Sequence, residues 1–441
     1  MLIKACIKSR QMIKLIFMRY IIIVCFIILS AIPLSAQETD GNDLKIKIAL
    51  YGNGDILFSW WGHTSLIIEE ESADINSSYD FGIFSFRNNN FYQNFIFGRF
   101  LFSTVKRNAQ NNINRYIRQN RDVTIFTLDL PPEKREEIRQ LAEFSILPEN
   151  RYYYYNFFYD NCSTRIRDII DIATEGQFKL QFSNEKYHYT LRQQARLHTW
   201  VSPITDWFLC FLMGKENDQP ITFWEAMFLP SELANSINNF NYTGENGVTR
   251  KLVSDTEIIY KSQGRYAVLD VPEKLWPYGL IAGITIAFIL FLLFFMQEKH
   301  PAIGQVVSGI TYSLFGLLTG VIGLILFFSG FFTDHEFTHY NINLLFYNPL
   351  ILVSVPFGIK YAIAKDYSRR ILSEFVLRFL WFLVVLGIIV SVILKLFPGF
   401  WQDNFHHQII LLPVALIFSL EPFGLKKLAR QIKMRFDKKN A

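Results

Sequence analysis

The sequence predicts an exported α+β domain followed by an all-α domain of several transmembrane helices. Three observations lead to this prediction: a basic and then apolar N-terminal segment, strand-like and helix-like patterns up to about residue 276, and five apolar stretches after it. Hydrophobic residues make up 51% of the 441-residue chain. They are concentrated in its second half, which indicates a membrane domain.

The first 36 residues have the features of a signal peptide or of an N-terminal anchor. Basic residues precede an apolar run from Tyr20 to Ile32, and the small residues Ser35 and Ala36 then offer a cleavage site before Gln37. The basic residues are Lys4, Lys8, Arg10, Lys14 and Arg19. A cleaved signal and a retained anchor both remain open, and both export the chain from residue 37 onward.

Residues 37–276 are predicted to form the α+β domain. Alternation of apolar and polar residues indicates four strands. The predicted strands are residues 44–51, 63–70, 79–86 and 123–130. A charged helix is expected from Glu133 to Phe144, and a second helix from about Cys162, with its isoleucines on one face. Beyond these, residues 186–240 are mostly helical in pattern, and residues 241–270 indicate turns and short strands.

A transmembrane domain of about five helices is predicted at residues 277–423. Its apolar stretches are residues 277–296, 305–332, 343–364, 374–397 and 406–421. Four of them are long enough to cross a bilayer core of ~30 Å, and the fifth is short and contains Pro413.

The connecting segments agree with an exported first domain, because Lys and Arg prefer the inner side of a membrane. The segments at 297–302 and 365–373 contain these residues, and those at 333–342 and 398–405 do not. The basic tail, residues 424–441, then lies in the cytoplasm. The residues from Glu421 onward include seven Lys and Arg and two acidic residues, and this excess of five positive charges equals the whole net charge of +5. The basic balance therefore gives no support for nucleic-acid binding.

Cys162 is the most informative of the four cysteines. Cys6 and Cys25 lie in the N-terminal segment, which leaves only Cys162 and Cys210. Asn161 is a good N-cap, so Cys162 is expected in the first turn of a helix, where free N–H groups and the helix dipole stabilise a thiolate. Arg165, one turn further, adds positive charge. A nucleophile, an inert thiol and a disulfide with Cys210 all remain open from position alone.

His63 is the preferred base for a thiol nucleophile, since a thiol needs a base to activate it. It follows Gly62 at the start of an expected strand, behind two tryptophans, whereas His188 and His198 are expected at the surface. A packed histidine without chemistry is the competing explanation. Asp80, at the start of the next expected strand, would lie beside His63 if the two strands pair, and is the preferred orienting group.

Three other segments have competing explanations. The sequence "HEFTH" at 335–339 has zinc-protease spacing, but it lies in a short external segment without a third ligand, so no metal site is predicted. The aromatic run 151–161 is expected to pack in the core, because no basic groove accompanies it. The apolar cluster at 223–237 is core or an amphipathic element at the membrane interface, and the nearby first span favours the interface.

A strand-borne histidine followed later by an Asn-Cys at a helix start resembles the circularly permuted papain-like fold of the lecithin–retinol acyltransferase group. More closely, the chain from about residue 44 to 350 resembles the Lnb family of Bacteroidetes, implicated in lipoprotein N-acylation. The resemblance rests on "GNGDILFSWWGHTSL", "YDFGIFSF", "FFYDNCSTRIRD", "ITFWEAMFLPSEL" and "NINLLFYNPL".

This resemblance implies a cysteine acyltransferase at the outer face of the inner membrane, with no cofactor. Its partners would be a phospholipid acyl donor and a diacylglyceryl lipoprotein acceptor. The expected catalytic residues are His63, Cys162 and Asp80. The expected substrate contacts are Trp61, Asn161, Arg165, Arg167, Asp334 and His335, with the arginines as candidates for holding a phosphate. A cysteine lipase or amidase and a non-catalytic envelope scaffold are the alternatives.

Overall fold

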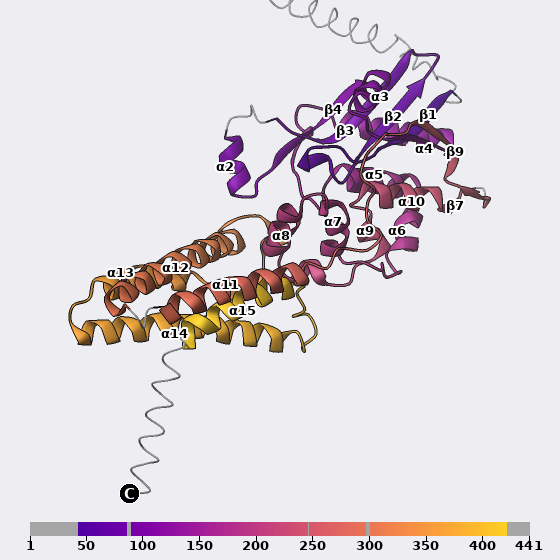
Figure 1. Ribbon diagram of the computed structural model, residues 1–441. Helices are drawn as coiled ribbons and strands as arrows, with labels where there is room; N and C mark the ends of the chain where they lie inside the picture. The colour runs from indigo at the N-terminus through magenta and orange to yellow at the C-terminus, as the bar shows by residue number, and fades with distance from the viewer. Residues whose placement is uncertain (1–42, 86–89, 246, 297–299, 421–441) are drawn as a thin grey trace, which may run out of the picture. The chain divides into compact units, whose positions relative to one another are not determined.

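The computed structural model describes residues 43–85, 90–245, 247–296 and 300–420 (Figure 1). The predicted signal segment, residues 1–36, and the predicted basic tail, residues 424–441, lie outside these ranges. Within them, strands and helices are mixed up to Tyr260, and only helices follow from Trp276. The change of structure therefore falls where the composition changes.

A seven-stranded antiparallel sheet is the centre of the first part, in the order β6-β4-β3-β2-β1-β5-β9. Its strands are β1 (Leu44–Tyr51), β2 (His63–Glu70), β3 (Ile75–Ile83), β4 (Leu101–Asn108), β5 (Val123–Leu128), β6 (Tyr152–Tyr154) and β9 (Val253–Tyr260). Two short strands, β7 (Asn241–Thr243) and β8 (Thr249–Lys251), pair separately. The sequence patterns predict β1, β2, β3 and β5 but miss β4 and β6.

Helices cover both faces of this sheet, because alternate residues of a strand point to opposite sides. Ile46 and Ile48 of β1 belong to the core that α4, α5 and α10 cover, whereas Ala49 and Tyr51 belong to the core that α3 covers. In Figure 1, α3 and α5 lie on opposite sides of the sheet. The bounds of these helices are α3 (Ala109–Arg118), α4 (Pro132–Phe144), α5 (Cys162–Ala173) and α10 (Pro230–Asn238).

Smaller helices complete the first part. They are η1 (Leu57–Ser59), α2 (Phe91–Ile96), α6 (Gln177–Phe182), α7 (Leu191–Thr199), α8 (Pro203–Leu212), η2 (Lys215–Asp218) and α9 (Phe223–Ala226). The predominantly helical pattern predicted for residues 186–240 is therefore observed.

Three expectations for the first part are wrong. Met227 and Phe228 are buried in core clusters, so residues 223–237 belong to the protein interior rather than to a membrane interface. Conversely, Tyr152 and Tyr154 are more than half exposed, so the aromatic run is not uniformly core. His198 is buried, not at the surface, and its Nδ1 lies 3.0 Å from a main-chain oxygen.

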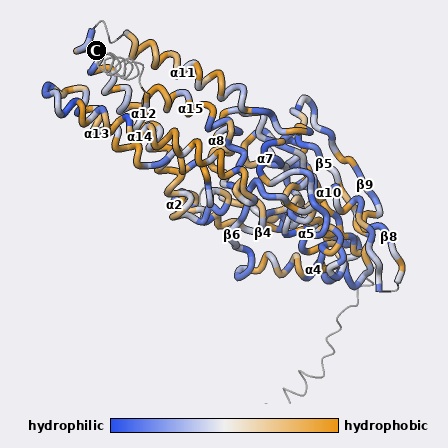
Figure 2. The backbone as a smooth tube through the Cα atoms, turned by 90° about the horizontal axis from the view of Figure 1, so that it is seen from below, coloured by the Kyte–Doolittle hydropathy of each residue, from blue (hydrophilic) through white to orange (hydrophobic). Residues whose placement is uncertain are grey.

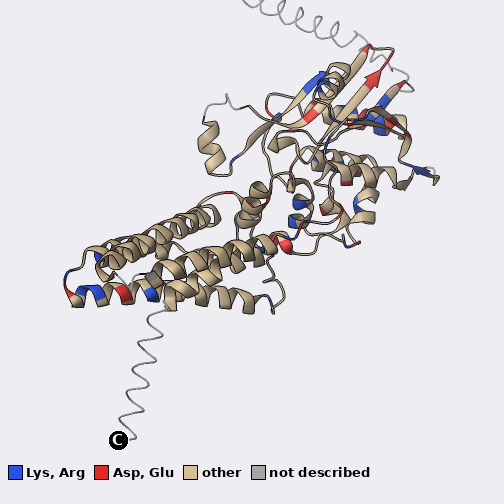
Figure 3. Cartoon of the chain, in the orientation of Figure 1, with Lys and Arg blue, Asp and Glu red and all other residues tan. Residues whose placement is uncertain are grey.

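The second part contains the five predicted apolar segments. They are α11 (Trp276–Met296), α12 (Pro301–Phe332), the segment Ile342–Ile363, α14 (Tyr367–Leu394) and α15 (Phe405–Leu420). The segment Ile342–Ile363 consists of η4 (Ile342–Leu345), η5 (Pro349–Val353) and α13 (Ser354–Ile363). The first four are long and apolar enough to cross a membrane, and α15 is shorter and contains Pro413. Figure 2 shows that these helices are predominantly hydrophobic, and Figure 3 shows a basic group where α13 meets α14.

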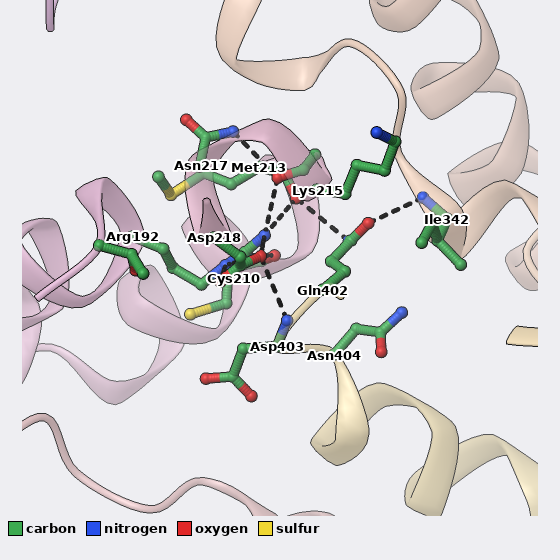
Figure 4. A network of polar contacts seen from close by, with 12 residues as sticks. Arg192, Cys210, Met213, Lys215, Asn217, Asp218, Ile342, Gln402, Asp403 and Asn404 are labelled. Carbon is green, nitrogen blue, oxygen red and sulfur yellow. Dashed lines mark hydrogen bonds and ion pairs between the residues drawn. The ribbon is translucent and has the colours of Figure 1, made fainter. Parts of the chain in front are cut away.

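Buried polar side chains join the first part to two segments that connect the apolar helices (Figure 4). Arg192, 0% exposed, donates from Nε to both carboxylate oxygens of Asp218, at 2.9 and 3.0 Å. Gln402 donates to the main-chain oxygen of Met213 at 3.2 Å and accepts from the N–H of Ile342 at 2.8 Å. Both connecting segments lack Lys and Arg, so their contact with the predicted exported domain agrees with the predicted topology.

Candidate active site

His63 begins β2, and its ring orientation is fixed by its neighbours. Gly62 before it has φ +82°, and a Cβ there would lie 2.9 Å from the main-chain oxygen of Tyr51, so this turn requires glycine. The imidazole stacks on the rings of Tyr51 and Tyr116, with centroids 6.1 and 5.9 Å away. Its side chain is only 13% exposed.

Asp80 lies on the neighbouring strand β3 and is completely buried, at 0% exposed. Its Oδ1 is 3.2 Å from Nε2 of His63. Ser65 Oγ also donates to Oδ1, Arg107 Nη1 donates to Oδ2 at 2.7 Å, and Asn112 Nδ2 donates to Oδ2 at 3.0 Å. Because the carboxylate engages Nε2, Nδ1 is the ring nitrogen left for another partner.

Cys162 is the first residue of α5, as expected from the Asn161 N-cap. Asn161 Oδ1 accepts from the N–H groups of Ser163 and Thr164, at 2.8 and 2.9 Å, and the Thr164 hydroxyl accepts from the N–H of Asn161. This capping box holds the helix start rigidly. Cys162 is 7% exposed, and its thiol interacts electrostatically with His63.

The electrostatics favour an ion pair between Cys162 and His63. Burial raises the pKa of a thiol, yet the pKa of Cys162 lies below its ordinary value because of the His63 charge and the hydrogen bonds from His63 and Thr64. Burial lowers the pKa of an imidazole, yet Tyr116, Cys162 and Asp80 hold the pKa of His63 well above its ordinary value. The arrangement therefore supports a thiolate–imidazolium pair at neutral pH.

The Asp80 carboxylate is charged for a related reason. Burial raises the pKa of a carboxyl group, but the pKa of Asp80 is held below its ordinary value by the hydrogen bond and charge of His63, by Ser65 and by the charge of Arg107. A buried anion at this position stabilises the imidazolium form of His63.

Arg165 and Arg167 are engaged by protein groups. Arg165 forms two hydrogen bonds with Asp160, at 2.6 and 2.9 Å, and its guanidinium lies 3.4 Å from the Tyr153 ring centroid. Arg167 donates to Asp168 and covers the Trp224 ring. Both side chains serve packing in this structure, so the geometry does not favour their expected phosphate contact.

Arg121 is a basic residue near the site that the sequence patterns miss. It is 5% exposed, its Nε donates to the Gly52 oxygen at 2.7 Å, and its guanidinium covers the Tyr116 ring. Burial lowers the pKa of Arg121, while the charges of Tyr116 and Cys162 act in the opposite direction. Within the described part of the chain, its Nη2 has no hydrogen-bond partner. Arg121 follows α3, a helix that is not predicted from the sequence, so no sequence motif places Arg121 near the site.

Trp61 and Asn161, two expected substrate contacts, have structural partners. Trp61 Nε1 donates to the main-chain oxygen of Ala195 at 3.2 Å. The amide of Asn161 is 4% exposed and, besides capping α5, donates to the main-chain oxygens of Phe157 and Phe228. Asn161 therefore positions the helix start, and Trp61 packs against a buried cluster that includes Phe228.

Asp334 and His335 lie in the connection between α12 and η4 and line a cavity of about 290 Å³. Asp334 Oδ2 accepts from Arg99 Nε at 2.8 Å. The His335 ring makes an edge contact with Phe100, with centroids 5.4 Å apart. Tyr155 lines the same cavity, and its ring lies near the start of α5, since a Cβ built on Gly82 would contact both the Tyr155 ring and the Cys162 nitrogen.

The disulfide alternative for Cys162 is not realised, since Cys162 and Cys210 are both free thiols. His335 and His339 flank the short turn η3 (Glu336–Thr338) instead of sharing one helix face. In the described ranges, no group of three or more His, Cys, Asp and Glu side chains is placed to hold a metal ion.

The ion pair predicts an unusual pH dependence of Cys162 alkylation. Because the pKa of Cys162 is lowered, its reaction with iodoacetamide is expected to reach half its maximal rate below the ordinary thiol pKa of ~8.5. In His63→Ala the imidazolium is lost while burial remains, so the midpoint is expected to move to higher pH. Mass spectrometry of the Cys162 peptide over a pH series measures both midpoints.

Cys210 is the internal control in the same samples. Burial raises its pKa to about 12, so it is expected to stay unmodified throughout the series. A Cys162 midpoint at or above that of an ordinary thiol, unchanged by His63→Ala, would contradict the ion pair.

Comparison with protein-family models matches two parts of the chain. Residues 34–200 match the Lnb N-terminal periplasmic domain, and residues 273–421 match the Lnb transmembrane domain. Searches of curated proteins and of solved structures gave no match. The two matched domains follow each other in the order in which the structure places the α+β part and the apolar helices. The chain therefore belongs to the Lnb family, a family of lipoprotein N-acyltransferases with a periplasmic domain and a transmembrane domain.

Proposed function

We propose that this protein moves an acyl chain from a phospholipid, through a thioester on Cys162, to the N-terminal amine of diacylglyceryl-cysteine lipoproteins. One observation carries the mechanism: a free thiol at a helix start interacts electrostatically with His63, which accepts its orientation from a wholly buried Asp80. Family membership supplies the substrate class.

The first step forms the acyl-enzyme. The Cys162 thiolate attacks the ester carbonyl carbon of the phospholipid, and a C–S bond forms. As the ester C–O bond breaks, the leaving alkoxide takes the proton of the His63 imidazolium and departs as lysophospholipid. His63 is then neutral and Cys162 carries the thioester.

The second step transfers the chain. The acceptor amine attacks the thioester carbonyl, a C–N bond forms and the C–S bond breaks. The proton lost by the amine goes to His63, and the Cys162 thiolate is restored. Asp80 stabilises the imidazolium in both steps without changing its own protonation state.

The oxyanion of each step requires hydrogen-bond donors near Cys162. The N–H groups of Ser163 and Thr164 are occupied by Asn161, so these two helix-start donors are not available to the oxyanion. The N–H of Cys162 itself is the donor that the capping box leaves available, so we assign it to the oxyanion.

The order of the catalytic residues supports a circularly permuted papain-like relationship. His63 lies on a strand that precedes the Cys162 helix, whereas ordinary papain-like enzymes place the cysteine first. We therefore assign residues 37–276 to a permuted papain-like periplasmic domain and residues 277–423 to the membrane domain. With the basic α13–α14 connection inside, the C-terminus lies in the cytoplasm.

Reconstitution of the full-length protein tests this function. The protein is placed in phosphatidylethanolamine vesicles with a diacylglyceryl-cysteinyl peptide whose α-amine is free. Mass spectrometry is expected to show the peptide heavier by one acyl chain, with lysophospholipid as the second product. Release of free fatty acid without peptide acylation would identify water as the acceptor and replace the transferase by a lipase. Absence of both products would support the scaffold alternative.

A further inference from the structure

The cavity beside the candidate active site has an uncompensated negative charge. Three carboxylates line it: Asp334 pairs with Arg99, Glu216 pairs with Lys215, and Glu336 accepts only a neutral hydrogen bond from Asn156 Nδ2, at 2.8 Å. Among the described residues, the ion pairs include none for Glu336.

Two histidines, His335 and His339, belong to the cavity wall. Burial lowers the pKa of His335 below its ordinary value, which keeps its ring neutral. A cavity with an unpaired carboxylate and no lining Lys or Arg favours a cationic ligand.

A buried amide adds a second acceptor to this cavity. Asn217 lines it and is 3% exposed. Its Nδ2 donates one hydrogen bond to the main-chain oxygen of Gly214 at 3.0 Å and another to that of Phe337 at 2.8 Å. Its orientation is therefore fixed, and Oδ1 is the end of the amide left to accept a hydrogen bond. Glu336 and Asn217 together offer a charged and a neutral acceptor.

Aromatic rings form the remaining wall. Phe157 makes edge contacts with Phe100 at 5.2 Å, with Tyr155 at 5.6 Å and with Phe337 at 6.0 Å between centroids. All four rings line the cavity. Carboxylate and amide acceptors beside aromatic faces are the features that bind an ammonium group, since hydrogen bonds and cation–π attraction then act together.

The cavity is placed to serve the reaction at Cys162. A Cβ built on Gly82 would lie 2.8 Å from the Tyr155 ring and 3.8 Å from the Cys162 nitrogen, so the Tyr155 ring, which lines the cavity, lies near the main chain of Cys162. Other lining residues belong to the connection that follows α12, a helix long enough to span the membrane. Its volume of about 290 Å³ suits a headgroup or a chain terminus rather than a whole lipid.

We propose that this cavity binds a primary ammonium group next to Cys162. The inference rests on the proposed acyl transfer, which offers two sources of such a group: the headgroup of an ethanolamine phospholipid donor, or the α-amine of the acceptor before it loses its proton. Glu336 and Asn217 hold the ammonium, and the rings of Phe157 and Phe337 enclose it.

Two variants test the cavity in the full-length protein. Glu336→Gln removes the charge but retains an oxygen for Asn156, and Phe337→Leu removes an aromatic face but leaves its main-chain contacts. Thioester formation on Cys162 is measured without acceptor, in vesicles of phosphatidylethanolamine or of phosphatidylglycerol. The KM for a diacylglyceryl-cysteinyl peptide is measured separately. Glu257→Gln, which removes an exposed charge on β9, is the matched control.

The two sources give different results. If the donor headgroup occupies the cavity, both variants are expected to lower the preference of thioester formation for phosphatidylethanolamine about tenfold, with acceptor KM unchanged. If the acceptor amine occupies it, acceptor KM is expected to rise about tenfold with thioester formation unchanged on both lipids.

Two results would overturn the ammonium site while acyl transfer stands. The first is that Glu336→Gln and Phe337→Leu both behave like Glu257→Gln in the two assays. The other is equal slowing of thioester formation on both lipids without a change in acceptor KM, which indicates a purely structural role. A wild-type protein that forms no thioester on either lipid would instead refute the acyl-transfer mechanism itself.

Discussion

Replacement of Cys162 by alanine is expected to abolish both thioester formation and peptide acylation. Without the sulfur no covalent intermediate forms, and the rate should fall by roughly 10⁴-fold or more, towards that of the uncatalysed reaction. The thiol is small and lies at the end of a helix that an intact Asn161 cap still holds, so folding should be retained. The measurement is the rate of peptide acylation in vesicles, followed by mass spectrometry.

Cys210→Ala is the matched control for this substitution. Cys210 is also a free, buried cysteine, but burial raises its pKa to about 12, and the contacts with Arg192 use its main-chain oxygen. This variant should acylate the peptide at nearly the wild-type rate. Equal activity of Cys162→Ala and Cys210→Ala would show that Cys162 is an inert thiol.

The parts of the site that could be predicted depend on local sequence. The patterns locate β1 and β2 at their observed ends, and the Asn161 cap locates the start of α5. The choice of Asp80 needed one tertiary assumption, that β2 pairs with β3, and the strands do pair. Hydrophobic periodicity and helix capping act within a few residues, which is why they can be recognised without a structure.

The missed parts depend on tertiary contacts. The helix α3 contains three asparagines in ten residues, a composition of low helix propensity, and it is stabilised by the Asn108 cap and by burial of Ile113 and Tyr116. With α3 and β4 unpredicted, the Asp80 partners Asn112 and Arg107, which lie on these two elements, could not be assigned. Ser65 could have been predicted as a partner of Asp80, because it lies two residues after His63 on the same face of β2.

The polar contacts in Figure 4, which join the first part of the chain to the segments between the apolar helices, could not be predicted from the sequence either. Arg192, Asp218 and Gln402 are separated by up to 210 residues, and none belongs to a recognisable motif. In sequence, Arg192 appears as a polar residue of a short helix, yet it is completely buried and bound to Asp218, which is also buried. Buried charges of this kind require paired partners, and only the fold identifies them.

Asp80→Asn is expected to reduce acylation by about 10³- to 10⁴-fold, because the neutral amide cannot stabilise the imidazolium form of His63. The carboxylate accepts from His63, Ser65, Arg107 and Asn112, and its pKa is held below the ordinary value, so the native group is an anion. Loss of this anion lowers the pKa of His63, which in turn raises the pKa of Cys162. The midpoint of Cys162 alkylation is therefore expected at higher pH than in the wild type.

A destabilised fold would also reduce activity, so the test needs a variant with a similar structural cost. Asp206→Asn provides it: Asp206 is 2% exposed and accepts from Arg196 and Thr199, as Asp80 accepts from several donors. Breaking either buried charge pair costs about 3–5 kcal/mol of stability, and thermal unfolding measures whether the two variants match. Only Asp80→Asn should shift the alkylation midpoint of Cys162, because only Asp80 contacts His63. A shift of equal size in Asp206→Asn, or no shift in either variant, would assign Asp80 a purely structural role and leave His63 without its proposed orienting group.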